Sequence, residues 1–168
     1  FEVKKNKCKL LVSPPPPKGS GDSEVSSLTQ GEDDDIWIGF NGGGVMRYNL
    51  KTKKQTLFRN DESDSGSVCS DQVNVVFKDS KGTIWVGTAD GVNVFGGISG
   101  KGLDRFDAKT STFTHFNHQE GDSFSLSNNN VICIAEDKNG ILWVGTRNGG
   151  LNRLDPTNGK FVSYTKNE

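Results

Sequence analysis

The side chains best suited to binding chemistry are amides, carboxylates and one guanidinium in short polar segments. They are Asn41, Asp71, Gln72, Asp90, Asn128, Asn129, Asn130, Arg147 and Asn148. Each offers directional hydrogen-bond donors or acceptors that an oligosaccharide or another small polyhydroxylated ligand can match. Phe95 adds an apolar face on which such a ligand can stack. The alternative for each Asn and Asp is that it serves the backbone of its own turn, which is a common role of these residues.

Catalysis, metal binding and cofactor binding have weaker support. His115 and His118 have no other histidine at metal-ligand spacing and no adjacent nucleophile, so we expect both to be satisfied or solvated. The acidic run at 32–35 lacks the spaced oxygen ligands of a calcium loop and predicts a solvated turn. The glycine-rich segment at 96–102 departs twice from the phosphate-binding loop pattern. We therefore predict no catalytic residue, no metal ligand and no cofactor.

Composition narrows the classes of partner. The 168 residues carry 20 basic and 21 acidic side chains, for a net charge of -1, so no basic surface for nucleic acid is expected. No apolar run approaches the roughly 20 residues of a membrane helix, so we expect membrane contact only through segments of a longer parent protein. Three cysteines without C-x-x-C spacing predict neither a disulfide framework nor a zinc site.

A three-fold internal repeat must position these residues. The phrases DIWIGF at 35–40, TIWVGT at 83–88 and ILWVGT at 141–146 recur, and each is followed by a glycine-led phrase and a closing aromatic. The closing aromatics are Phe58, Phe116 and Tyr164. The tryptophans are 48 and 58 residues apart, because the middle unit carries an insertion at 92–101. Such a period is typical of a repeat protein built from stacked supersecondary units.

Each unit predicts four short antiparallel strands joined by tight turns, which is the pattern of a β-propeller blade. In the Asp-x-x-Gly turns at 79–82 and 137–140, Asp can bind the turn backbone and Gly can adopt a positive φ. The fold class is therefore all-β, with about three blades and one extra N-terminal strand, truncated from a larger propeller. The expected units are the last strand of a preceding blade at 1–12, a Pro/Gly/Ser-rich connector at 13–24, blade one at 25–60, a connector and blade two at 61–117, and a connector and blade three at 118–168.

The repeated aromatic and basic residues have structural explanations. Trp37, Trp85 and Trp143 are expected to pack between blades, since stacked repeats bury each other's faces. The matching arginines are expected to pair locally. In an up-and-down blade, the turn between strands two and three lies at the same end as the connector to the next blade. Function should favour that end, which collects the polar residues named first.

The segment VICIAEDKNGILWVGTRNGGLNRLDPTNGKFVSY at 131–164 resembles, nearly position for position, the two-component regulator propeller repeats of periplasmic sensor regions in bacterial hybrid histidine kinases. The resemblance is good at 73–116 and weaker at 25–58, where GEDDD replaces the Asp-x-x-Gly turn. It implies a seven-bladed propeller, a membrane helix and a kinase in the parent protein. It also implies a periplasmic location within an inner-membrane receptor, and the sensing of glycan fragments.

Three functions remain open. The leading hypothesis is a sensor segment without catalytic activity, in which ligand binding shifts a homodimeric parent receptor between arrangements and so controls the linked kinase. The second is a fragment of a propeller lyase or glycosidase. The third is a protein-binding scaffold, because stacked repeats present broad surfaces.

Overall fold

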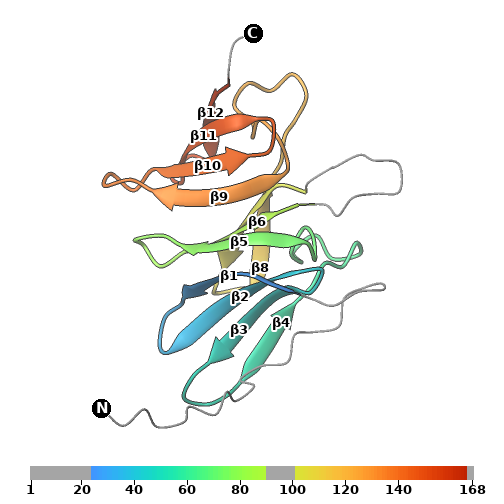
Figure 1. The fold of residues 1–168 in the computed structure, drawn as a ribbon, viewed down its shortest axis with the longest axis vertical. Coiled ribbons are helices and arrows are strands. Elements are labelled where there is room, and N and C mark those ends of the chain that lie inside the picture. The colour runs from blue at the N-terminus through green and yellow to red at the C-terminus, as the bar shows by residue number, and fades with distance from the viewer. Residues whose placement is uncertain (1–23, 90–100, 166–168) are drawn as a thin grey trace, which may run out of the picture.

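The computed structural model describes residues 24–89 and 101–165, which form twelve strands and no helix. The strands make three antiparallel sheets of four, each in chain order, stacked one above another (Figure 1). The first sheet holds β1 (Glu24–Gln30), β2 (Asp35–Asn41), β3 (Gly44–Asn49) and β4 (Gln55–Phe58). The second holds β5 (Val73–Lys78), β6 (Ile84–Thr88), β7 (Leu103–Asp107) and β8 (Thr112–Phe116). The third holds β9 (Val131–Glu136), β10 (Leu142–Thr146), β11 (Gly150–Asp155) and β12 (Lys160–Tyr164).

The predicted four-stranded unit is confirmed in all three repeats. The strand expected at 1–12, the connector up to residue 23, and the insertion except Lys101 lie outside the described residues. Asp90 and Phe95 lie outside them as well.

The hairpins at 79–82 and 137–140 form as the Asp-x-x-Gly pattern predicts. Oδ1 of Asp79 accepts hydrogen bonds from the backbone N–H groups of Lys81 and Thr83, and Gly82 has a φ of 85°. Asp137 binds its own turn in the same way. One carboxylate therefore closes each of these two turns.

The first hairpin closes differently, because Gly31 stands where the other repeats have Asp. The backbone bond from the N–H of Gly31 to the carbonyl of Asp35, at 2.8 Å, has equivalents in the other two hairpins, and the difference is that Asp33 and Asp34 take positive φ values. The prediction of a solvated acidic turn is wrong for Asp35, which is only 2% exposed. Its carboxylate accepts hydrogen bonds from Nε of Arg47 at 2.5 Å and from Nδ2 of Asn49 at 2.7 Å.

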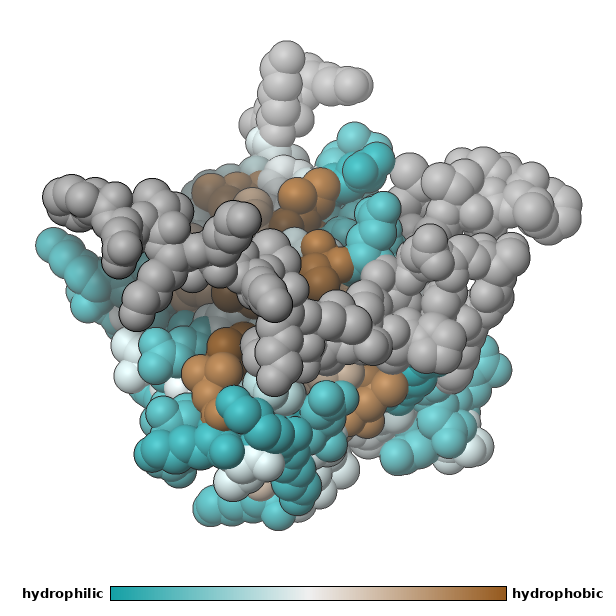
Figure 2. Space-filling model, turned by 60° about the horizontal axis from the view of Figure 1, so that its bottom comes forward, coloured by the Kyte–Doolittle hydropathy of each residue, from teal (hydrophilic) through white to brown (hydrophobic). Residues whose placement is uncertain are grey.

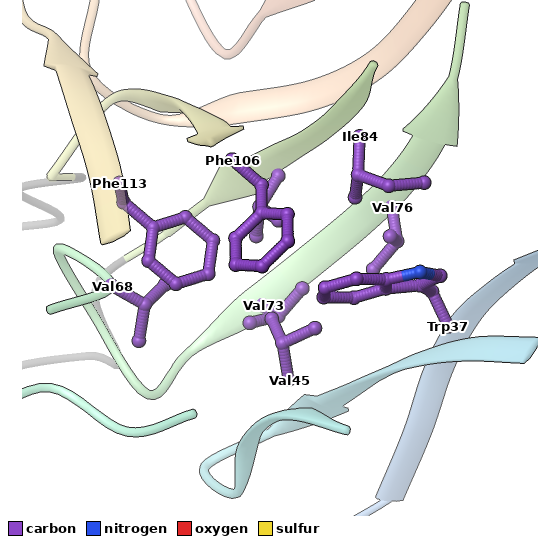
Figure 3. Close-up of a cluster of buried hydrophobic side chains, with 9 residues drawn as sticks. Trp37, Val45, Val68, Val73, Val76, Ile84, Phe106 and Phe113 are labelled. Carbon is purple, nitrogen blue, oxygen red and sulfur yellow. The ribbon is translucent and has the colours of Figure 1, made fainter. Parts of the chain in front are cut away.

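Two hydrophobic cores lie between successive sheets. In the first core, Phe106 of the second sheet packs edge-on against Trp37 with ring centroids 4.7 Å apart (Figure 3). Trp37 also stacks on Phe58 of its own sheet, at 5.5 Å between centroids. In the second core, Trp85 is fully buried, and Phe161 of the third sheet packs against Phe116. The first and second sheets therefore each present a tryptophan and a closing aromatic that the next sheet covers.

Trp143 does not pack between two described sheets, contrary to the prediction for all three tryptophans. It is only partly buried, although Trp37 and Trp85 are in the cores as predicted. It lies 5.8 Å from Tyr164 on a face where Leu151 and Val162 are also exposed, and no described sheet covers that face. On the surface shown in Figure 2, hydrophobic residues are visible as separate brown areas among hydrophilic ones.

Candidate functional site

The turns between second and third strands meet the connectors between sheets at one edge, as the topology predicts. The N–H of Gly42 donates to the carbonyl of Asp71 at 3.0 Å, and that of Ala89 donates to the carbonyl of Gln72 at 2.8 Å. In the third sheet the N–H of Arg147 donates to the carbonyl of Asn130 at 2.9 Å. We call this surface the turn edge, comprising residues 41–44, 71–72, 88–89, 102, 128–130 and 147–149.

Several polar side chains of the turn edge serve the local backbone. Oδ1 of Asp71 accepts from the N–H of Asn60 at 2.8 Å, and Oδ1 of Asn128 accepts from the N–H of Asn130 at 2.8 Å. Oδ1 of Asn129 accepts from the N–H of His118 at 2.5 Å. Asn130 itself is only 3% exposed, which limits its contact with a ligand.

Four predicted binding residues keep their side chains available. They are Asn41, Gln72, Arg147 and Asn148, for whose side chains no hydrogen bond to another described residue is found. Asn41 and Gln72 face each other across a β-bridge at the junction of the first two sheets. Asn148 holds a φ of 62° in the turn of the third sheet, beside the exposed Arg147. Amides and a guanidinium at one edge can bind hydroxyl or carboxylate oxygens.

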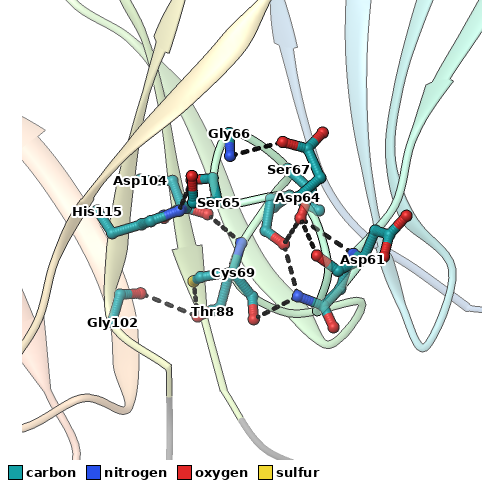
Figure 4. Close-up of polar contacts among 12 residues, drawn as sticks. Asp61, Asp64, Ser65, Gly66, Ser67, Cys69, Thr88, Gly102, Asp104 and His115 are labelled. Carbon is teal, nitrogen blue, oxygen red and sulfur yellow. Dashed lines mark hydrogen bonds and ion pairs between the residues drawn. The ribbon is translucent and has the colours of Figure 1, made fainter.

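A buried polar cluster that was not predicted from the sequence lies beside the turn edge (Figure 4). Asp104 is fully buried, and its Oδ1 lies 2.6 Å from Nδ1 of His115. Its Oδ2 accepts from the N–H of Cys69 at 2.8 Å. Nε2 of His115 lies 2.9 Å from the carbonyl oxygen of Ser65, and Sγ of Cys69 lies 3.2 Å from Oγ1 of Thr88. Contrary to expectation, a thiol does lie near His115.

The electrostatics of this cluster oppose nucleophilic catalysis. Both ring nitrogens of His115 face acceptors, a carboxylate and a carbonyl, so the doubly protonated imidazolium satisfies both. The hydrogen bond to Asp104 raises the pKa of His115, against a smaller opposing effect of burial. Burial, together with the charge of Asp104, raises the pKa of the Cys69 thiol. A reactive cysteine needs the thiolate, which this environment disfavours.

The third sheet shows what the cluster does. Asn152 occupies the position of Asp104, and its Oδ1 accepts from the N–H of Ser127 at 2.9 Å and from Oγ of Ser163 at 3.0 Å. Oγ of Ser127 lies 3.2 Å from Oγ1 of Thr146, as Cys69 does from Thr88. We call each arrangement a connector latch, because it fastens a connector to the third strand. Cys69, Asp104 and His115 place possible ligand atoms within 4.8 Å of one another, yet amide and hydroxyl groups build the same arrangement in the third sheet.

The pairing of β7 with β8 could have been used to predict one contact of the connector latch from the sequence. Asp104 and His115 are directly paired across β7 and β8, so their side chains share a face. The contribution of Cys69 comes from a connector 35 residues earlier in the chain, and no sequence spacing indicates it.

Comparison with known proteins agrees with this architecture. A family model described as two component regulator propeller matches residues 67–90 and 125–148. Each match begins in a connector and extends past the second strand of the following sheet. Two segments of this chain match two-component regulator propeller repeats. The predicted family is thereby confirmed for the second and third repeats.

The relatives are longer than this chain. Histidine kinase P4 of Formosa agariphila is 40% identical over 73 residues, which are 44% of this chain and 5% of that protein. The extracellular domain assigned to a hybrid two-component system of B. thetaiotaomicron is 25% identical, with a TM-score of 0.71 over 84% of this chain and 18% of that one. Virginiamycin B lyase from Staphylococcus aureus, at 18% identity and a TM-score of 0.61, shares the fold over 90% of this chain and 44% of the lyase.

These likenesses confirm the all-β propeller fold and link the repeats to two-component systems. The B. thetaiotaomicron relative is an extracellular domain, which is in keeping with placement outside the cytoplasm. Among the described residues there is no helix of the length and apolarity that crossing a membrane requires.

Proposed function

We propose that this chain is a ligand-sensing, non-catalytic segment of a periplasmic propeller, that it recognises a glycan fragment through the turn edge, and that binding controls a linked histidine kinase. The observation that carries the proposal is the meeting of connectors and inner turns at one edge, with four polar side chains that form no hydrogen bond to another described residue. The likeness to an extracellular domain of a hybrid two-component system supports the sensing role.

The chemistry of the turn edge supports a polyhydroxylated ligand. Amides of Asn41, Gln72 and Asn148 each carry both donors and acceptors, and Arg147 adds a charged donor. Sugars present hydroxyl groups of the same dual character. The edge therefore fits a glycan better than an apolar ligand.

A connector is a suitable element through which binding can act. Carbonyl groups of the connector before the second sheet accept backbone hydrogen bonds from turns of both flanking sheets. A ligand at the turn edge would contact two sheets at once and favour one arrangement of the parent homodimer. In the parent inner-membrane receptor, a membrane anchor would transmit that change in arrangement to the kinase.

The first experiment screens the 168-residue chain against a glycan array and measures the affinity of the best ligand for two variants. Arg147→Ala, at the turn edge, is expected to weaken binding at least fivefold. Lys138→Ala, which removes the same charge from the opposite hairpin of the third sheet, is expected to leave affinity unchanged. Equal affinity for both variants and the unaltered chain would count against recognition at the turn edge.

The second experiment tests control of the kinase in the protein that contains this chain. Autophosphorylation is measured with and without the glycan, for the unaltered receptor and for Arg147→Ala. We expect the glycan concentration for half-maximal response to rise in the variant. Mass spectrometry of the recovered glycan separates sensing from lyase or glycosidase activity, since cleavage would support the enzyme. Capture of a defined protein without any glycan response would favour the scaffold.

A further inference from the structure

The three tryptophans of the repeat differ in what their indole N–H groups meet. Nε1 of Trp85 donates to Oδ2 of Asp79 at 2.9 Å, and Nε1 of Trp143 donates to Oδ2 of Asp137 at 3.2 Å. The residue at this position in the first sheet is Gly31, which has no carboxylate. No hydrogen bond from Nε1 of Trp37 to another described residue is found, although Trp37 is only 3% exposed.

A cavity of about 470 Å³ adjoins Trp37 between the first and second sheets. It lies at the end opposite the turn edge, among the hairpins that join first to second strands and the turn after β7. Its lining includes Trp37, Arg47, Phe106, Lys81 and Lys109. Phe106 and the Trp37 ring supply an apolar wall, and the basic side chains supply the polar one.

The charges around this cavity leave cations in excess. Glu32 pairs with Lys78 at 3.2 Å, and Asp35 is held by Arg47 and Asn49. The third acid of the lining, Asp107, accepts from the backbone N–H of Lys109 and keeps its charge. Against these three acids the lining holds four basic residues, Arg47, Lys81, Arg105 and Lys109. By contrast, neither Lys81 nor Lys109 forms an ion pair with any residue in the ranges 24–89 and 101–165. Arg47 uses Nε for Asp35 and leaves 44% of its side chain exposed.

We propose that this cavity binds the carboxylate of a small acidic ligand. The carboxylate accepts from Nε1 of Trp37, as Asp79 and Asp137 accept from the equivalent tryptophans. Arg47 and Lys109 balance its charge. The inference extends the proposed function by adding an acidic group, such as a uronic acid, to the glycan class, and only that choice of ligand rests on the proposed function. The site itself is separate from the turn edge.

The test uses the three indole N–H signals of the ¹⁵N-labelled chain in NMR spectra. Sodium glucuronate, sodium acetate and neutral methyl glucoside are titrated at constant ionic strength. We expect both carboxylates to shift the Trp37 signal along a saturable curve, with the Trp85 and Trp143 signals fixed, and methyl glucoside to have no effect on any of them. The signals are assigned from through-space contacts in the unaltered chain, so the test does not depend on a tryptophan variant.

Two matched lysine variants sharpen the result. Lys109→Gln is expected to weaken the carboxylate titration by about two- to fivefold, while Lys138→Gln, at a hairpin of the third sheet, leaves it unchanged. A Trp37 signal that does not move, or that moves equally with methyl glucoside, would overturn the carboxylate site. Glycan binding at the turn edge is measured separately through Arg147→Ala, so either proposal can fail while the other stands.

Discussion

Nε1 of Trp85 donates a hydrogen bond to Oδ2 of Asp79 at 2.9 Å, inside the core between the second and third sheets. The same carboxylate closes the preceding hairpin through two backbone N–H groups. The Asp-x-x-Gly turn and the tryptophan of the repeat are therefore one structural unit. The turn backbone holds the carboxylate of Asp79 in place, and that carboxylate orients the Trp85 indole, which the third sheet covers.

Replacing Asp79 is expected to weaken both the hairpin and the orientation of Trp85. Asp79→Ala leaves buried donors without an acceptor and is expected to lower the free energy of unfolding by about 1–3 kcal/mol. Asp107→Ala, at the exposed end of β7 in the same sheet, should stay within about 0.5 kcal/mol of the unaltered chain. Urea denaturation measures both, and a larger loss at Asp107 would contradict the assigned role of Asp79.

The tryptophans should differ in their contribution to stability. Trp85→Ala removes a fully buried ring and is expected to cost about 3–5 kcal/mol. Trp143→Ala is expected to cost clearly less, because Trp143 packs mainly on Tyr164 and keeps an exposed side. Denaturant melts of the two variants compare them directly, and equal losses would mean that the outer face of the third sheet is covered in solution.

The glycine of the W-V-G-T phrase makes room for the next sheet. A methyl group at Gly87 would lie 2.5 Å from Cγ1 of Val131 and 2.6 Å from Cγ1 of Val75, so Gly87→Ala is expected to cost about 1–3 kcal/mol. At Gly145 the one close neighbour is Sγ of the exposed Cys133, at 2.6 Å, and that side chain can turn away. Thermal melts should therefore show a smaller loss for Gly145→Ala; the reverse order would refute this packing.

The connector latch of the second sheet should make stability depend on pH. The pKa of His115 is raised in the folded chain, so its contribution is complete below the unfolded value of about 6.5 and is lost as pH rises through the folded value. The double variant Asp104→Asn, His115→Ser copies the neutral latch of Asn152 and Ser163. Urea melts from about pH 5 to 9 should show a steeper loss of stability with rising pH in the unaltered chain than in this variant. Identical pH profiles would exclude an ionised His115 latch.

Much of this fold was predictable because the repeat carries both its strands and its turns. The Asp-x-x-Gly turns and the recurring tryptophan phrases act over a few residues, so the strands at 73–77 and 131–135 could be placed from local patterns. Gly31 broke the pattern, yet the first hairpin formed. It keeps the backbone bond that the other two hairpins have, here from Gly31 to Asp35, and Asp33 and Asp34 take positive φ values.

Features that depend on contacts distant in sequence were not predictable. The burial of Asp35 requires Arg47 on the neighbouring strand, and the latch requires Cys69 to reach Asp104 from a connector. Trp143 and Trp85 have the same local sequence, and only the presence of a covering sheet distinguishes their burial. At the turn edge, residue type could not distinguish Asn129, which accepts from the N–H of His118, from Asn148, whose side chain bonds no other residue that the structure describes.

Fluorescence quenching by acrylamide in single-tryptophan variants tests the stacking of the three sheets most directly. Each variant keeps one tryptophan and carries Phe at the other two positions, with folding checked by circular dichroism. The structure predicts strong protection of Trp37 and Trp85 and ready quenching of Trp143. Quenching of Trp85 as readily as Trp143 in a folded variant would contradict the account, because the third sheet would then not cover the second.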